Sequence, residues 1–503
     1  MMKDRRSEKP RMLSKRDVFC ERVIEFGLLG LIIFSPLPAA STGEWSILTI
    51  QLIVLIMFVS FIIMKKKPQD NELLSRSLKW PSYMFIGVFT FIVLQIIPLP
   101  KLLVKIFSPN TFSFHELNSV GFLNRKFMSI SLIPSHTFRE GLEVLSYFLV
   151  AFLIVKTVTK KQQIIRIFSA LVALGTFQAF YGLFELYNRS PNILFYKKIY
   201  HLDSVTGTFV NRNHLSGYLE MIIPLAIGLI ISRISFFSFA GLKWREKLLR
   251  LSQKGLSINL VLVGSIIIMS LAILFSKSRS GMFILFFTFV LFFGLTKLYF
   301  GSYEHHKKGI RNFLNISFLL VIIISLYIGI DATVERFAID DILVEGRPIF
   351  WGNTLRIFSK YPLFGAGLGT FPSIYPDLMI DNKLIRIYHA HNDYLEYLSE
   401  MGIVGFILLV GGIFLLIMNA FRLWKRRRHP EVKGLAIGGF VSVFCILFHS
   451  ITDFNLHIPA NMLLFSVVLS LTLVITNYKR RNNLKKPSQQ SPEEEDIQLR
   501  SKK

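Results

Sequence analysis

Apolar residues in this chain are grouped into twelve blocks of about twenty, the length that an α-helix needs to cross a hydrocarbon core roughly 30 Å thick. The first block is the least regular, because Glu25 and the sequence Ser35-Pro36-Leu37-Pro38 interrupt it. A soluble chain of 503 residues would normally carry more charge than the 18% found here. The sequence therefore predicts an all-α, polytopic membrane protein. The predicted spans are 21–38, 45–64, 80–98, 141–158, 164–187, 214–233, 258–275, 281–299, 313–330, 402–422, 435–451 and 460–477.

Lys and Arg are distributed unequally between the segments that join these blocks. With the N-terminus placed in the cytoplasm, the cytoplasmic segments hold 40 of them and the outer segments hold 17. Basic loops are retained in the cytoplasm, where they also meet anionic lipids. We therefore interpret the net charge of +26 as orienting the protein among membrane lipids, and we expect no nucleic acid partner. Both termini are predicted to be cytoplasmic.

The chain divides into three predicted regions: a cytoplasmic segment 1–20, a membrane domain 21–477 and a cytoplasmic tail 478–503. We expect no cleaved signal peptide, because mostly polar residues precede the first block. The tail mixes basic and acidic residues without periodicity and is predicted to be disordered. Two cysteines, Cys20 and Cys445, are too few for a disulfide framework or a thiolate metal site.

The largest predicted outer loop, 331–401, is expected to carry short helices. An amphipathic pattern runs from Arg347 to Tyr361, and a second helical pattern begins at His391 and continues into the next block. The glycine-rich sequence between them, 362–372, lacks the Lys-Ser/Thr of a phosphate-binding loop. We predict that it forms a tight turn, which lets a loop helix pack closely on the membrane surface.

Ionisable residues at membrane depth are costly and therefore suggest function. Arg279 lies in a minimal turn, 276–281, between two apolar blocks. Its guanidinium group presents a rigid fork of donors that suits phosphate oxygens. A charge that merely snorkels to the interface is the alternative, and the spacing leaves both open.

The outer loop contains further candidates. Arg347 and Arg356 lie on the amphipathic segment, where a surface or lipid-headgroup contact is the simpler interpretation of each. His391 could act as a base or orient a hydroxyl group. It could instead cap the helix that follows, or bind zinc together with His389 and Asp393.

Several carboxylates also lie in outer segments. The pair Asp340-Asp341 could belong to a metal-dependent membrane glycosyltransferase, although a solvated face of mixed charge explains it equally well. The last outer turn places Asp453 and His457 near the interface, and His449 in the preceding block is predicted to face the bundle interior.

Four elements, in order, resemble the bacterial O-antigen ligase/polymerase family. The resemblance covers roughly residues 200 to 420, and the plan of twelve spans with one large outer loop extends it over most of the chain. The elements are the run Phe209-Val210-Asn211-Arg212-Asn213, the turn Ser278-Arg279-Ser280-Gly281, Arg347 followed by Trp351 and the glycine-rich 362–371, and His391-Asn392 followed by Gly402 and Gly405.

The resemblance implies an inverting, metal-independent glycosyltransferase of the C-type membrane fold, without a cofactor. Its donor would be a glycan on undecaprenyl diphosphate, and its acceptor another glycan, at the periplasmic face of a bacterial inner membrane. Arg279 and Arg347 would grip the donor diphosphate, and His391 would activate or orient the acceptor hydroxyl. Gly402 and Gly405 would be structural. The residues expected to contact substrate are Asn211, Arg212, Asn213, Arg356, Asn392 and Asp453.

The residues leave the acceptor open. A ligase would use a lipid A core in lipopolysaccharide assembly, and a polymerase would use a growing polysaccharide. We favour a ligase because the histidine signature is complete. A lipid-glycan flippase or transporter would predict internal repeats and broken helices, neither of which the sequence indicates. A purely structural scaffold would leave the arginines and His391 unexplained.

Overall fold

The structure, a computed structural model, describes residues 14–65, 72–117, 126–190, 192–194, 196–233, 254–299, 319, 346–378, 387–427 and 429–478. Among these residues, nine helices are long and apolar enough to cross a membrane, so the chain is a multi-pass, helical membrane protein. These helices are α2 (Glu44–Ile63), α3 (Glu72–Ile96), α7 (Lys161–Tyr187), α8 (Arg212–Ser232), α10 (Lys254–Phe275), α11 (Arg279–Tyr299), α17 (Asp393–Lys425), α18 (Pro430–His449) and α19 (Pro459–Asn477).

The predicted count of twelve spans is supported only in part. Two further predicted blocks coincide with α1 (Lys15–Phe34) and α6 (Pro134–Thr157), which are long helices but are not among the nine. Both carry charged side chains within the helix, which lowers their apolar content. The block 313–330 lies outside the described residues except for Leu319. Twelve spans thus remain a prediction.

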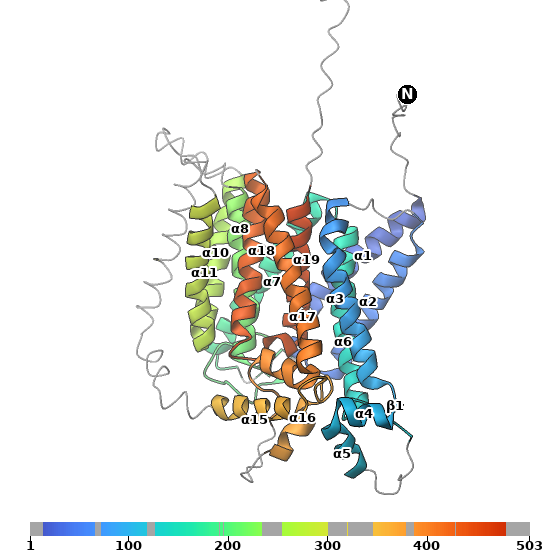
Figure 1. Cartoon of the computed structure of the whole chain (residues 1–503). Coiled ribbons are helices and arrows are strands. Elements are labelled where there is room, and N and C mark those ends of the chain that lie inside the picture. Colours follow the sequence, from blue (N-terminus) through green and yellow to red (C-terminus); the bar gives the residue numbers. More distant parts are fainter. Residues whose placement is uncertain are drawn as a thin grey trace, which may run out of the picture.

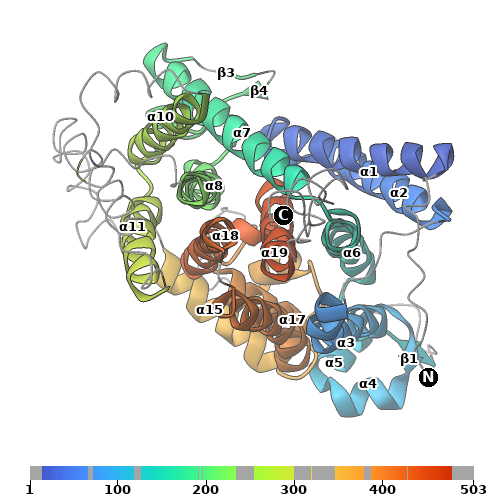
Figure 2. The same ribbon diagram turned by 90° about the horizontal axis from the view of Figure 1, so that it is seen from above.

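Three helices, α8, α18 and α19, form the centre of the bundle, and the other long helices surround them (Figure 2). Nearly every residue of α8 and α19 is buried. The backbones of α8 and α18 approach closely at glycines, since a Cβ atom on Gly228 would lie 2.9 Å from the Gly434 carbonyl oxygen and 3.0 Å from Gly438 Cα. Small residues at a helix interface permit this approach, which is the usual way in which membrane helices pack.

The short elements gather at one end of the bundle, here called the α15 end (Figure 1). There α15 (Arg347–Lys360) lies across the ends of the long helices. The other short helices are α4 (Lys101–Phe107), α5 (Pro109–Leu117), α16 (Phe371–Ile374), η1 (Ala39–Ser41), η4 (Tyr375–Leu378) and η5 (Asn455–His457). Two antiparallel strand pairs complete the fold: β1 (Leu99–Pro100) with β2 (Phe127–Met128), Leu99 opposite Met128, and β3 (Asn192–Ile193) with β4 (Tyr196–Lys197), Asn192 opposite Lys197.

Helix α17 is broken at Gly402, where φ is +62°. The break leaves backbone N–H and C=O groups without partners inside the helix, and the glycine-rich loop forms hydrogen bonds with them. Ile403 N–H donates to the Pro362 carbonyl (2.8 Å), while Ala366 N–H donates to the Ser399 carbonyl (3.0 Å) and Gly367 N–H to the Glu400 carbonyl (2.9 Å). Irregular backbone in a membrane protein persists only where the protein itself satisfies it.

The loop therefore forms tight turns as predicted, with positive φ at Gly365, Gly367 and Gly369. Its partner is a helix that breaks at Gly402, the first residue of the predicted span 402–422, so the helical pattern that begins at His391 does not continue unbroken into that span. Gln95 of α3 joins both partners, because its Nε2 donates to the Phe364 carbonyl (2.7 Å) and the Glu400 carbonyl (3.0 Å). The junction anchors the loop that leads from α15 to α17.

Candidate active site

Asp453 is the centre of a polar cluster at the α15 end. It lies in the turn between α18 and α19 and is completely buried. Its Oδ2 accepts a hydrogen bond from Asn213 Nδ2 (2.6 Å), and its Oδ1 lies 3.2 Å from His391 Nδ1. Arg347 Nη2 is 3.8 Å from Oδ2, and His214 Nε2 is 3.8 Å from Oδ1. Four segments far apart in the sequence thus meet at one carboxylate.

The surroundings of Asp453 favour its ionised form. Burial would raise the pKa of this carboxyl group, but the facing imidazoles of His214 and His391 outweigh burial and hold its pKa well below the ordinary value. Asp453 is therefore a buried anion that can support positive charge on its neighbours.

His391 is held in an uncommon backbone conformation, with φ of +52°. Trp351 Nε1 donates to its carbonyl (3.2 Å), and its ring stacks on Phe350 with centroids 6.0 Å apart. Strained backbone of this kind persists where the surroundings fix it, often at functional sites. Because Nδ1 faces the Asp453 anion, Nδ1 is the protonated nitrogen and Nε2, across the ring, is an acceptor. The side chain is 29% exposed, so Nε2 can be reached from outside.

The turn that carries Arg279 packs against the same place. Ser280 Oγ is hydrogen bonded to Thr452 Oγ1 (2.8 Å), directly beside Asp453. On the other side, Ser276 Oγ is hydrogen bonded to Ser216 Oγ of α8 (2.8 Å). These bonds fix the start of α11, and with it Arg279, at the same end of the bundle as Arg347 and His391.

The zinc site that His389, His391 and Asp393 could have formed is not present among these residues. His389 Nδ1 lies 2.8 Å from Glu396 Oε1, whereas His391 faces Asp453. Asp393 turns to His457, whose Nδ1 lies 2.6 Å from its Oδ1. The two histidines therefore belong to different carboxylates.

Residues 264–410 match the model of a protein family described as O-antigen ligase. The chain carries an O-antigen ligase family domain. Enzymes of this O-antigen ligase/polymerase type act in lipid-linked glycan assembly. No curated protein matches the chain. The O-antigen ligase match includes Arg279, Arg347 and His391, whereas Asn213 and Asp453 lie outside it. The cluster around Asp453 therefore joins the matched domain to the helices before and after it.

Some of the residues expected to contact substrate also have local structural contacts. Asn211 caps α8, since its Oδ1 accepts from Asn213 N–H (2.9 Å), and Arg212 is the first residue of that helix. Asn392 caps α17 by accepting from Leu395 N–H (3.1 Å), so the cap is not His391. Arg356 is exposed on α15 and donates to Asn353 Oδ1 (3.5 Å).

The two signature glycines lie where the chain packs closely. Gly402 is the break in α17, and a Cβ atom there would lie 2.4 Å from the Leu363 carbonyl carbon. Gly405 packs on α3, where a Cβ atom would lie 2.7 Å from the ring of Phe91. The loop carboxylates Asp340 and Asp341 lie outside the described residues.

Sequence reasoning missed two polar residues near the cluster. His214 contacts Asp453 and directly follows the Asn211–Asn213 run, so the motif could have been extended by one position. Glu220 lies inside α8 and meets His449 Nδ1 of α18 at 2.9 Å, with both side chains fully buried. His449 does face the bundle interior, as predicted. Glu220 could have been singled out from the sequence, because a carboxylate inside an apolar block suggests a functional or paired residue.

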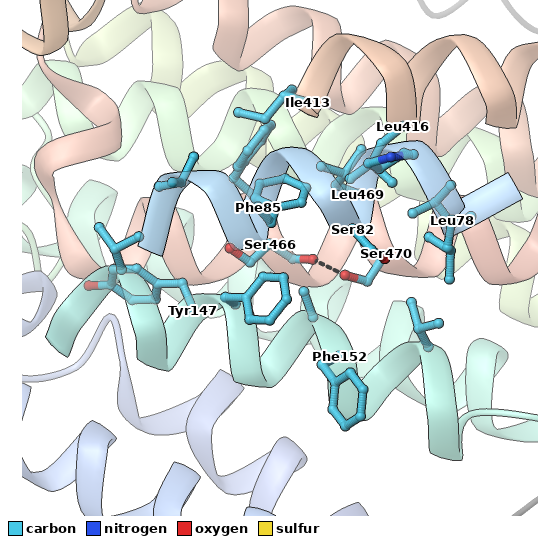
Figure 3. A pocket seen from close by; sticks show the side chains of 18 of the residues that line it. Leu78, Ser82, Phe85, Tyr147, Phe152, Ile413, Leu416, Ser466, Leu469 and Ser470 are labelled. Atoms are coloured by element: carbon cyan, nitrogen blue, oxygen red, sulfur yellow. Dashed lines mark hydrogen bonds between the residues drawn. The ribbon is translucent and has the colours of Figure 1, made fainter. Parts of the chain in front are cut away.

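An apolar cavity of about 320 Å³ lies between α3, α6, α17 and α19 (Figure 3). Phe85, Phe152, Ile413 and Leu469 are among the side chains that line it. The hydroxyl group of Ser470 donates back to the Ser466 carbonyl of its own helix (2.6 Å), so the wall stays apolar there. A cavity of this kind suits a hydrocarbon chain.

Proposed function

We propose that this protein transfers a glycan from undecaprenyl diphosphate to an acceptor saccharide, as an O-antigen ligase in lipopolysaccharide assembly. The single observation that supports this most is the contact between His391 and the buried anion Asp453, with Arg347 beside it. It offers a base and a phosphate-binding cation in one place. The match to the O-antigen ligase family supplies the substrate class.

The proposed reaction is a direct displacement at the anomeric carbon. The acceptor hydroxyl donates to His391 Nε2 and attacks from the face opposite the diphosphate. The carbon–oxygen bond to the diphosphate breaks, its electron pair stays on the phosphate oxygen, and the configuration inverts. His391 takes the proton, a step typically worth about 10²–10⁴-fold in rate. The Asp453 carboxylate then stabilises the imidazolium.

The arginines act on the leaving group in this proposal. Arg279 and Arg347 neutralise the charge that grows on the departing diphosphate, which is usually the largest electrostatic contribution to catalysis. Guanidinium groups bind phosphate oxygens with two parallel hydrogen bonds. No metal ion takes part in breaking the bond. The apolar cavity would receive part of the polyprenyl chain, since its lining matches hydrocarbon.

The site is proposed to face the periplasm of a bacterial inner membrane, with both chain termini in the cytoplasm. The excess of Lys and Arg in the opposite loops supports this orientation. Cysteine labelling from outside the cell tests it: a cysteine at Arg356, exposed on α15, should react with an impermeant reagent. Protection of that position, with reaction of a cysteine at His429, would reverse the orientation.

The transfer reaction itself is tested by reconstitution. Purified protein, an undecaprenyl-diphosphate glycan and a lipid A core acceptor should give an extended product on a gel. His391→Ala should slow extension by about 10²–10⁴-fold, while His429→Ala, which changes an exposed histidine at the other end of the bundle, should leave the rate unchanged. Full activity of His391→Ala, Arg279→Ala and Arg347→Ala together would refute the mechanism.

A repeat-unit polymerase would use the same site and chemistry with a different acceptor. In the reconstituted reaction it would produce a ladder of lengths from the lipid-linked donor alone. A flippase would move the donor without forming a glycosidic bond. The formation of a new glycosidic bond therefore decides between these classes.

A further inference from the structure

A second group of ionisable side chains lies beside the His391–Asp453 pair. It consists of His389, in the segment before α17, Glu396 on α17 and His457 of η5. Glu396 Oε1 lies 2.8 Å from His389 Nδ1 and 3.5 Å from His457 Nε2. One nitrogen or oxygen from each of the three side chains lies within 4.8 Å of the others. This group shares no side chain with the proposed transfer site.

The imidazole of His457 is oriented so that its Nε2 points into this group. Its Nδ1 lies 2.6 Å from Asp393 Oδ1, so when Nδ1 donates to this carboxylate and a metal ion displaces the other ring proton, Nε2 offers a lone pair to the ion. Only 6% of the side chain is exposed, and Nε2 has no hydrogen bond within the described part of the chain. A carboxylate that fixes the remote nitrogen of a histidine is the usual support for a metal-binding imidazole.

The local charge favours a cation. Asp393 and Glu396 contact the imidazoles directly, and Glu140 of α6 and Glu400 lie within electrostatic range of His457. Glu400 Oε2 is likewise buried without a hydrogen bond among the described residues. The side chain of His389 is 26% exposed, which gives an ion a way in.

We propose that His389, Glu396 and His457 bind a divalent metal ion, with zinc as the best fit and Asp393 holding His457 in place. Two imidazole nitrogens and one carboxylate oxygen are ligands that zinc accepts. Tetrahedral bonds of roughly 2.0–2.2 Å place ligand atoms about 3.3–3.6 Å apart. The 3.5 Å between His457 Nε2 and Glu396 Oε1 already matches this, all three ligand atoms lie within 4.8 Å of one another, and the 2.8 Å contact of His389 Nδ1 with Glu396 Oε1 would lengthen by about 0.5 Å when an ion enters.

The ion would clamp the segment before α17 to the α18–α19 turn. His391 follows His389 by two residues, and Asp453 precedes His457 by four, so the clamp holds the proposed base near its carboxylate. The role is structural. It depends on the geometry of these side chains and not on the proposed transfer reaction.

Metal content of the purified protein tests this proposal. The full chain is purified with a histidine-free affinity tag, and zinc is measured by mass spectrometry. We expect about one zinc ion per chain, reduced at least about tenfold in His389→Ala and His457→Ala. Glu396→Gln preserves the shape of the side chain and should also lose zinc. It therefore tests the site even if a histidine variant fails to fold. His391→Ala is the matched control: it should keep its zinc while it loses transfer activity.

Two results would overturn the proposal. The wild-type protein could contain less than about 0.1 zinc per chain and take up none when zinc is added, which would mean that a protonated His457 is the cation between Asp393 and Glu396. Alternatively, zinc could persist at full occupancy in all three ligand variants. A protein that binds zinc but transfers no glycan would refute the proposed function alone.

Discussion

His391 and Asp453 are 62 residues apart in the sequence, and their side chains meet with Nδ1 3.2 Å from Oδ1. One comes from the loop before α17 and the other from the turn after α18. The carboxylate is buried and the imidazole is partly open to solvent. This arrangement orients the histidine and leaves one of its nitrogens available for a substrate.

The pair is expected to act as one unit. His391→Ala should lower kcat by about 10²–10⁴-fold, because the acceptor hydroxyl loses its base. Asp453→Asn should lower kcat at least about tenfold, because the imidazolium loses its counter-charge. The double variant should be no slower than His391→Ala. If single-turnover assays showed that the fold-loss in rate of the double variant equals the product of the two single losses, the two side chains would act independently.

Asp453 should also make stability depend on pH. Its pKa is depressed in the folded protein, so it contributes stability that is present above its unfolded pKa of about 3.9 and is lost as pH falls towards the folded value. The stability difference between wild type and Asp453→Asn should therefore shrink as pH decreases below about 4. Thermal unfolding in detergent from acid to neutral pH measures this. A difference that stays constant in acid would mean that Asp453 is not ionised in the fold.

The two arginines should not tolerate lysine. Arg279→Lys and Arg347→Lys keep the charge but lose the planar pair of donors, so each should cost about 1.4 kcal/mol or more of transition-state binding, a tenfold loss in kcat/KM. Arg139→Ala is the control, because that side chain is exposed and pairs only weakly with Glu44 at 3.3 Å. Lysine variants with wild-type kcat/KM would mean that charge alone suffices.

Gly402 should be intolerant of a side chain. Gly402→Ala combines a positive φ with a Cβ atom 2.4 Å from the Leu363 carbonyl carbon, so it should destabilise the protein by about 3 kcal/mol or more. Gly411→Ala on the same helix is the matched control, since within the described residues nothing lies within 4 Å of its added Cβ. Thermal unfolding measures the stability of both variants. Equal stability of Gly402→Ala and Gly411→Ala would contradict the break at Gly402.

The apolar cavity gives a test of lipid binding. Ala151 lines it, and Ala151→Trp would occupy much of its volume of about 320 Å³. The variant should raise KM for an undecaprenyl donor and change KM little for a donor with a short prenyl chain. Equal effects on both donors would place the lipid elsewhere.

The sequence predicted the parts of this fold that depend on local pattern. Apolar blocks gave the helices, and the amphipathic pattern that begins at Arg347 gave α15. The O-antigen ligase resemblance identified Arg279, Arg347 and His391, which the structure places at the same end of the bundle. Their partners were harder to predict, because the contact between His391 and Asp453 depends on how α17, α18 and α19 pack.

Other residues could not be interpreted from spacing. His389 and His391 appear as a pair in the sequence, yet the left-handed backbone at His391 sends the two side chains to different carboxylates. Asn211 and Asn392 resemble substrate ligands by motif, and each also stands at a helix start, where its amide oxygen caps a free N–H group. These caps depend on where each helix begins, which the motif alone does not show.

The break in α17 also has a consequence for biogenesis. Residues 362–367 leave the ribosome before 399–404, yet each segment completes the hydrogen bonds of the other. Gln95, made far earlier, joins both. Assembly of this junction is therefore a late event that couples an early helix to the last third of the chain, and truncation before α17 would leave the loop backbone without its partners.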